Sequence, residues 1–190
     1  MKVKLVKYDP EWKSLFEIEK EKLIKVISSK EIKVEHIGST SIPDIYSKPI
    51  IDIMIGAEEE EQLNSNINSI ISLGYTYVQK YEICMPFRRY FFKPKSLDIQ
   101  FPKIIGFNDP DVNNENKDSF HIHMVEINSD FWIKHLLFRN YLRNNYKARK
   151  EYENTKKALA KMEWDSVNDY ANAKSDCISK ILEKAKNSKI

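Results

Sequence analysis

A glycine–serine turn followed by an acid on an apolar strand is the first feature of this sequence that could do chemistry. Gly38 and Ser39 end one apolar stretch, and Asp52 lies within the next one, residues 50–55. A glycine lets the backbone approach a bound group, while an amide and a hydroxyl can donate hydrogen bonds to a phosphate. An unpaired carboxylate within an apolar strand would be costly. We therefore expect a metal, a basic side chain or a hydrogen-bond network to hold Asp52.

Two histidines separated by one residue form a second candidate site. Alternation along a strand expected at residues 120–127 puts His121 and His123 on the same face. Imidazoles arranged in this way are familiar ligands of Zn²⁺ or Mn²⁺. His36, which precedes the glycine turn, could join them or could simply hydrogen-bond the loop backbone. Asp52 could be a further ligand, or it could be neutralised by a basic side chain without any metal.

Several motifs in this sequence resemble the GrpB family, also called UPF0157. The likeness extends over nearly the whole chain and implies a fold similar to the nucleotidyltransferase superfamily. In that superfamily a Gly-Ser turn precedes paired acids on the next strand, and a third acid lies on a later strand. The motifs that carry the resemblance are YDPEW at residues 8–12, HIGST at 36–40, KPIIDI at 48–53, FHIH at 120–123 and LFRNYLR at 137–143.

The resemblance assigns roles to the acids of this chain. Asp52 follows Ser39 at the spacing expected of the first acid. Asp98, on an expected strand at residues 97–101, takes the place of the third acid. The two carboxylates could together hold one Mg²⁺ or Mn²⁺ ion if their strands are neighbours. Met54 stands where the superfamily has its second acid, so a second metal ion would lack a ligand.

Composition excludes several classes of protein. Lys and Arg total 31 against 28 Asp and Glu, and the net charge of +3 is too small to indicate a nucleic-acid-binding surface. Cys84 and Cys177 lack the spacing of metal ligands and are expected to be reduced thiols. No apolar run approaches the roughly 20 residues that span a bilayer, and the N-terminus lacks a signal-peptide pattern. These features predict a cytoplasmic protein without a membrane partner.

The pattern of apolar residues predicts an α+β fold in one domain over residues 1–190. We expect a nucleotidyltransferase-like mixed β-sheet flanked by helices at about residues 1–128, followed by a C-terminal helical section at about 129–190. A polar loop at residues 106–117 could act as a lid or could be a solvated connector. The expected helices are 10–28, 57–73, 130–144, 146–162 and 166–186, and the expected strands are 32–37, 50–55, 75–79, 87–93, 97–101 and 120–127.

Three functions remain open from the sequence. The first is a metal-dependent nucleotidyltransferase, with a nucleotide or another phosphorylated small molecule as its ligand. The second is a non-catalytic nucleotide- or RNA-binding module on the same fold, and the third is a His-based metallohydrolase. The candidate catalytic residues are Asp52, Asp98 and His123; the candidate substrate-binding residues are Gly38, Ser39, Thr40, Lys48, Arg88 and Arg139; and the candidate metal ligands are Asp52, Asp98, His36, His121 and His123.

Overall fold

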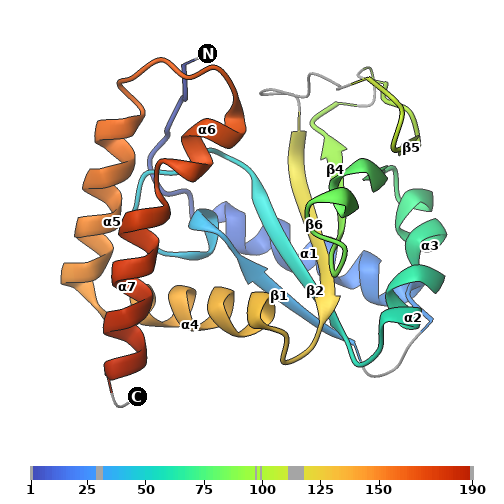
Figure 1. Ribbon diagram of the computed structural model, residues 1–190, viewed down its shortest axis with the longest axis horizontal. Helices are drawn as coiled ribbons and strands as arrows, with labels where there is room; N and C mark the ends of the chain where they lie inside the picture. The colour runs from blue at the N-terminus through green and yellow to red at the C-terminus, as the bar shows by residue number, and fades with distance from the viewer. Residues whose placement is uncertain (1, 29–31, 97, 99, 111–117, 189–190) are drawn as a thin grey trace.

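A mixed β-sheet with strand order β1-β2-β6-β4-β3-β5 forms the centre of the computed structural model (Figure 1). The structure describes residues 2–28, 32–96, 98, 100–110 and 118–188. Strands β2 and β6 are parallel, as are β3 and β5, whereas the other neighbouring pairs are antiparallel. The strands are β1 (Lys33–Ile37), β2 (Ile51–Ala57), β3 (Thr76–Val78), β4 (Arg89–Pro94), β5 (Ile104–Ile105) and β6 (Asp118–Glu126).

Helices cover both faces of this sheet. Helices α1, α2 and α3 pack on one face, and α4 packs on the other face, where α5, α6 and α7 extend the helical section (Figure 1). The helices are α1 (Glu11–Val26), α2 (Glu60–Ser65), α3 (Ile67–Ser72), α4 (Asp130–Asn144), α5 (Tyr146–Leu159), α6 (Val167–Asn172) and α7 (Ser175–Asn187), with short 3₁₀ helices η1 (Ser39–Ser41) and η2 (Gln79–Ile83). The predicted α+β fold with a mixed sheet is confirmed.

The alternation of β2 decides which face of the sheet carries polar groups. Ile51, Ile53 and Ile55 are buried in the core beneath α1. Asp52 and Met54 therefore point to the opposite face, toward the C-terminal helices. The burial of the three isoleucines beneath α1 fixes the register, because a slip by one residue would turn all of them to the opposite face and put Asp52 into this core.

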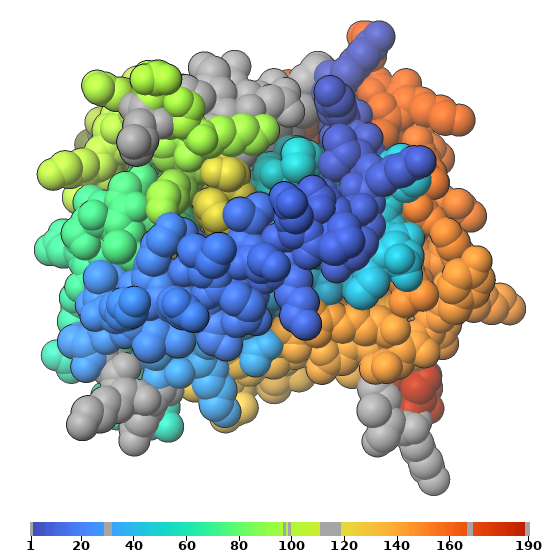
Figure 2. Space-filling view, turned by 180° about the vertical axis from the view of Figure 1, so that it is seen from behind, coloured from blue at the N-terminus to red at the C-terminus, as the bar shows by residue number. Residues whose placement is uncertain are grey.

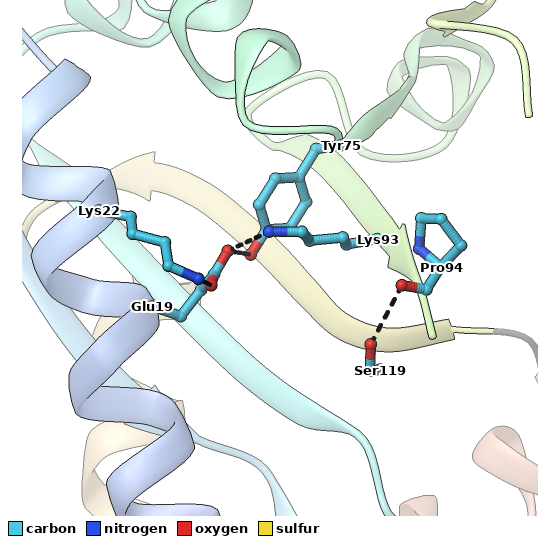
Figure 3. A network of polar contacts seen from close by, with 6 residues as sticks. All are labelled: Glu19, Lys22, Tyr75, Lys93, Pro94 and Ser119. Carbon is cyan, nitrogen blue, oxygen red and sulfur yellow. Dashed lines mark hydrogen bonds and ion pairs between the residues drawn. The ribbon is translucent and has the colours of Figure 1, made fainter. Parts of the chain in front are cut away.

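A buried polar network fastens α1 to the sheet (Figure 3). Glu19 is 1% exposed and accepts hydrogen bonds from Lys93 at 2.7 Å, from Lys22 at 2.9 Å and from the Tyr75 hydroxyl at 3.1 Å. Burial alone would raise the pKa of Glu19, but the two lysines outweigh it and lower that pKa. The ionised carboxylate therefore ties α1 to β4.

Two expected elements differ from the structure. The expected helix at residues 57–73 is divided into α2 and α3 at Asn66, whose side chain accepts from the Ser28 amide at 3.1 Å and donates to the Gln62 carbonyl at 2.7 Å. Side chains that bond to nearby backbone in this way compete with helical hydrogen bonds. The expected helix at 166–186 is likewise divided, into α6 and α7, with Lys174 at the break.

The expected strand at residues 97–101 is wrong for the residues that the structure describes there. Asp98 lies in an exposed turn, where its amide donates to the Ser96 hydroxyl at 3.2 Å and its carboxylate accepts from the same hydroxyl at 3.1 Å. These local bonds replace strand pairing. Leu97 and Ile99 lie outside the described residues, as do residues 111–117 of the expected lid or connector.

Two further expectations bear on the environment of the protein. Cys84 and Cys177 are both free thiols, as expected. Across the part of the chain that the structure describes, no helix has both the length and the apolar character needed to cross a membrane.

Candidate functional site

Asp52 is held between the two histidines of β6. In the parallel pairing of β2 and β6, Asp52 lies opposite His121 and Met54 lies opposite His123. Asp52 Oδ1 is 3.3 Å from His121 Nδ1 and 3.9 Å from His123 Nε2. Burial alone would raise the pKa of Asp52, but the two adjacent imidazoles outweigh burial and hold that pKa far below its usual range. The expected placement of both histidines on one face of the sheet is confirmed.

Arg88 fixes the tautomer of His123. Its Nη1 lies 3.2 Å from His123 Nδ1, and a guanidinium can only donate, so Nδ1 must be the acceptor. Burial lowers the pKa of His123 to about 4, so the ring is neutral at pH 7. A neutral imidazole with an unprotonated Nδ1 carries its proton on Nε2. That proton points toward Asp52.

The glycine turn fits directly against the same carboxylate. Gly38 has φ 68° and ψ −173°, a backbone conformation open essentially to glycine alone. A Cβ atom at this position would lie 2.9 Å from the Asp52 Cβ and still closer to its carboxylate. The Ser41 hydroxyl donates to the Gly38 carbonyl at 2.7 Å, which stabilises the turn. The turn therefore needs glycine both for its conformation and for the contact with Asp52.

A cavity of about 210 Å³ opens beside this turn, between β2, β6 and the C-terminal helices. Its charged side chains are one carboxylate, Asp52, and three lysines: Lys48, Lys156 and Lys174. The remaining lining residues are Leu5, Ser39, Thr40, Ile50, His121, Tyr170 and Ala171. Because the cations outnumber the single acid, we call this space the lysine cavity.

Two of the lysines are held where a charge is unfavourable. Burial lowers the pKa of Lys156 to about 7, and the charge of Lys174 acts in the same direction. Burial lowers the pKa of Lys174 to about 8, and the positive charge of Lys48 also lowers it. Lys156 is 2% exposed and donates to the Tyr46 carbonyl at 2.5 Å. A negative ligand would relieve the repulsion among these groups.

Tyr170 brings an unpartnered hydroxyl to the same cavity. The residue is 3% exposed, and its hydroxyl has no hydrogen-bond partner among the described residues. The Nζ of Lys174 lies 4.5 Å from the centre of its ring. A buried polar group without a partner costs about 1–3 kcal/mol. A ligand oxygen in the cavity would satisfy this hydroxyl.

Several residues predicted from the sequence meet at this place. Ser39, Thr40, Lys48, Asp52 and His121 line the lysine cavity. His123 and Gly38 contact Asp52 directly, and Arg88 contacts His123. The Thr40 hydroxyl donates to the Ile50 carbonyl at 2.9 Å, so it braces the start of β2.

Other predicted site residues lie elsewhere. His36 pairs with Ile53 and stacks on Phe16 with ring centres 4.7 Å apart, on the opposite face of the sheet from the β6 histidines. The expectation that His36 shares a metal ion with them is therefore wrong. Asp98 lies in its exposed turn rather than on a strand beside β2, so the basis for pairing it with Asp52 is also wrong. Arg139 does not line the lysine cavity.

Sequence reasoning missed the contribution of the C-terminal helices. Lys156, Tyr170 and Lys174 line the cavity, and the Tyr152 hydroxyl lies 3.4 Å from the Ser39 hydroxyl. A signal for one of them was present, because Ala148, Tyr152 and Lys156 recur every four residues along α5, and all three are buried. A lysine on an apolar stripe indicates a buried charge with a specific role.

The site does not fit the expected divalent metal. Over the described residues, no group of three or more His, Cys, Asp and Glu side chains is arranged to hold a metal ion. The proton on His123 Nε2, set by Arg88, occupies the nitrogen that faces Asp52. Met54 is fully buried and offers no carboxylate for a second ion.

The fold and the lysine cavity define a protein with a helix-covered mixed sheet and a positively charged pocket beside a glycine turn. The model of the family described as "GrpB protein" matches residues 2–184. The chain belongs to the GrpB family.

Similar proteins include other members of this family. The UPF0157 protein YqkA of Bacillus subtilis is 36% identical over 185 residues, which are 97% of this chain and 48% of that protein, so the chain spans about half of this relative. The glutamate-rich protein GrpB of Alkalihalophilus pseudofirmus is 32% identical, over 94% of this chain and 92% of that protein.

Two solved structures are also similar. The crystal structure of GrpB from Enterococcus faecalis has a TM-score of 0.74 and 33% identity, covering 96% of both chains. The Cid1 poly(U) polymerase, described with MgGTP bound, has a TM-score of 0.48 and 12% identity, covering 83% of this chain and 44% of that chain.

Proposed function

We propose that this chain binds the phosphate groups of a nucleotide or another phosphorylated small molecule in the lysine cavity. The observation that carries the proposal is the convergence of Lys48, Lys156 and Lys174 with the unpartnered hydroxyl of Tyr170. Three cations around one small space favour an anion with several negative charges. Phosphate groups supply that charge together with many acceptor oxygens.

The size of the cavity indicates how much of the ligand it holds. Its volume of about 210 Å³ lies below the range of about 300–1,000 Å³ that encloses a whole small-molecule ligand. Phosphate groups would fill it, and the rest of a nucleotide would extend beyond it. Ser39 lines the cavity, with its hydroxyl 3.4 Å from the Tyr152 hydroxyl, and it could donate to a phosphate oxygen.

Binding without a bound metal is the form of this function that the geometry supports best. Asp52 already lies between two imidazoles, Met54 is apolar, and Asp98 lies in an exposed turn rather than on the sheet. The lysines can neutralise phosphate charge directly, as metal ions do in metal-dependent transferases. The non-catalytic binding module is therefore favoured over a two-metal transferase.

A second candidate is acid–base catalysis on the bound phosphate compound. His121 lines the lysine cavity, and its Nδ1 lies 3.3 Å from Asp52 Oδ1. A carboxylate that accepts from one ring nitrogen orients the imidazole and makes the other nitrogen a stronger base. The measurement is the release of phosphate or pyrophosphate from nucleotides. Catalysis by His121 would be supported if His121→Gln abolished this release while the affinity for the nucleotide stayed the same.

The binding proposal is tested by isothermal titration of pyrophosphate and ATP into the full chain with EDTA present. Lys174→Gln removes one charge from the cavity and is expected to weaken binding by at least about tenfold, since a charge-assisted hydrogen bond contributes about 1.5–3 kcal/mol. Lys147→Gln is the matched control, because Lys147 is exposed and lines no part of the cavity. Absence of saturable binding, or an equal loss in both variants, would refute the proposal.

A further inference from the structure

A second cavity borders the same short helix, η1. It has a volume of about 370 Å³ and is enclosed by residues of α1, β1, η1 and α4. Figure 2 shows this side of the molecule, where the N-terminal segment and α1, in blue, adjoin the helical section in orange. Thr40 lines both cavities, so η1 forms part of the wall between them. We call this second space the arginine cavity.

Two arginines, which lie one turn apart on α4, contribute positive charge to the arginine cavity. Arg139 is already engaged, since its Nη1 lies 2.6 Å from Glu35 Oε2 and 2.8 Å from the His36 carbonyl. Arg143 donates from Nε to the Ser41 carbonyl at 2.9 Å and makes no ion pair within the described part of the chain. Its guanidinium is therefore anchored at one edge, while Glu35, which attracts its charge, forms an ion pair with Arg139 instead.

The other charged side chains that line the arginine cavity leave it with an excess of positive charge. Lys13 and Lys20 add two cations, and Glu17 is the one acid of the lining besides Glu35. Burial lowers the pKa of His36 to about 4, so this residue adds no positive charge at pH 7. Four cations thus face two carboxylates. Phe16, stacked on His36, gives the space an apolar wall.

We propose that the arginine cavity is a second ligand site, which binds a small organic oxyanion through Arg143 and packs the apolar part of that ligand against Phe16. A guanidinium matches the geometry of a carboxylate or phosphate with two parallel hydrogen bonds. The volume of about 370 Å³ is large enough to enclose a small molecule. This site does not depend on the lysine cavity, because the two share Thr40 but none of their cations.

The test is an NMR titration of the ¹⁵N-labelled full chain with phenyl phosphate and, separately, with benzoate. Both probes carry a ring, and they distinguish a phosphate from a carboxylate as the preferred group. We expect saturable shifts of the Ser41 amide and the Arg143 Nε–H signal with at least one probe. The probe with the higher affinity identifies the oxyanion.

Variants separate this site from the first one. Arg143→Gln is expected to weaken probe binding about tenfold. Arg143→Lys, which keeps the charge but loses the planar fork, is expected to bind more weakly than the parent and provides a second measurement if the glutamine variant does not fold. Lys147→Gln, a change at an exposed position that lines neither cavity, is expected to leave the probe-induced shift of the Ser41 amide as it is in the parent. Absence of saturable shifts with both probes, or unchanged affinity in a folded Arg143 variant, would overturn the proposal.

Discussion

Gly38 and Asp52 are in direct contact: the carboxylate of Asp52 occupies the space that a Cβ atom on Gly38 would need. The first prediction follows from this contact and from the φ of 68° at Gly38. We expect Gly38→Ala to lower the free energy of unfolding by about 1–3 kcal/mol for the backbone conformation alone, and by more for the overlap. Gly106→Ala is the control, because no atom lies within 3.4 Å of its added Cβ. Equal urea midpoints for the two variants would contradict this account.

The second prediction concerns the stability of the ligand-free protein as a function of pH. Burial lowers the pKa of Lys156 to about 7 in the folded protein, below its ordinary value of about 10.5. Between these values the unfolded chain binds more protons than the folded protein, so the free energy of unfolding should rise with pH from about 7 to about 10. Lys156→Met should reduce that rise, as measured by urea unfolding at several pH values. Identical pH slopes in parent and variant would show that Lys156 is not held as described.

The third prediction concerns Tyr170. Its buried hydroxyl has no partner among the described residues, so Tyr170→Phe removes a polar group that costs free energy when no ligand is bound. We expect the melting temperature of the free protein to stay equal or rise, while the affinity for pyrophosphate falls several-fold. A lower melting temperature together with unchanged affinity would mean that the hydroxyl is satisfied within the protein instead.

The fourth prediction separates direct phosphate binding from metal-dependent binding. Asp52 is the one acid of the lysine cavity, so it repels an anion that the lysines attract. Asp52→Asn should therefore bind pyrophosphate at least as tightly as the parent when EDTA is present. The Asp52→Asn variant should be less stable to urea, since its side chain no longer carries the negative charge that interacts with both imidazoles. The metal-dependent function would be supported instead if the parent bound pyrophosphate only with Mg²⁺ present and Asp52→Asn lost that binding.

The fifth prediction concerns the network that holds α1. Glu19 accepts from Lys93, Lys22 and Tyr75 and is almost fully buried. Glu19→Gln leaves Lys93 without its acid, and we expect a loss of about 3 kcal/mol in the free energy of unfolding. Glu17→Gln, an exposed change on the same helix, should cost less than about 0.5 kcal/mol. Similar urea midpoints for the two variants would rule out a structural role for the network.

Features set by short-range patterns were predictable from the sequence. The apolar run at residues 50–55 identified a strand that carries Asp52, and the alternation around His121 and His123 placed both imidazoles on one face. These patterns repeat every two residues, so the facing of each side chain follows once the strand is recognised. The turn at Gly38 was evident for a similar reason, because few residues other than glycine tolerate such a backbone.

Features set by long-range packing were not predictable. Lys156 and Lys174 reach the cavity because α5 and the α6–α7 connection pack against a loop more than 100 residues earlier, and Lys156 donates to the Tyr46 carbonyl there. No local pattern shows which neighbour a helix will meet. The prediction that Asp98 lies on a strand was wrong for a different reason. Its hydrogen bonds with Ser96 form a local turn, which competes with the strand predicted from the flanking apolar residues.

Proton uptake on ligand binding tests the central claim most directly. Titration calorimetry of pyrophosphate at about pH 8, in two buffers of different ionisation enthalpy, counts the protons bound with the ligand. The account predicts a net uptake, because an anion in the lysine cavity raises the pKa of Lys156 and Lys174 from about 7 and about 8. That uptake should be smaller in Lys156→Met. Binding without proton uptake, or the same uptake in the variant, would contradict the assignment of the phosphate site to these lysines.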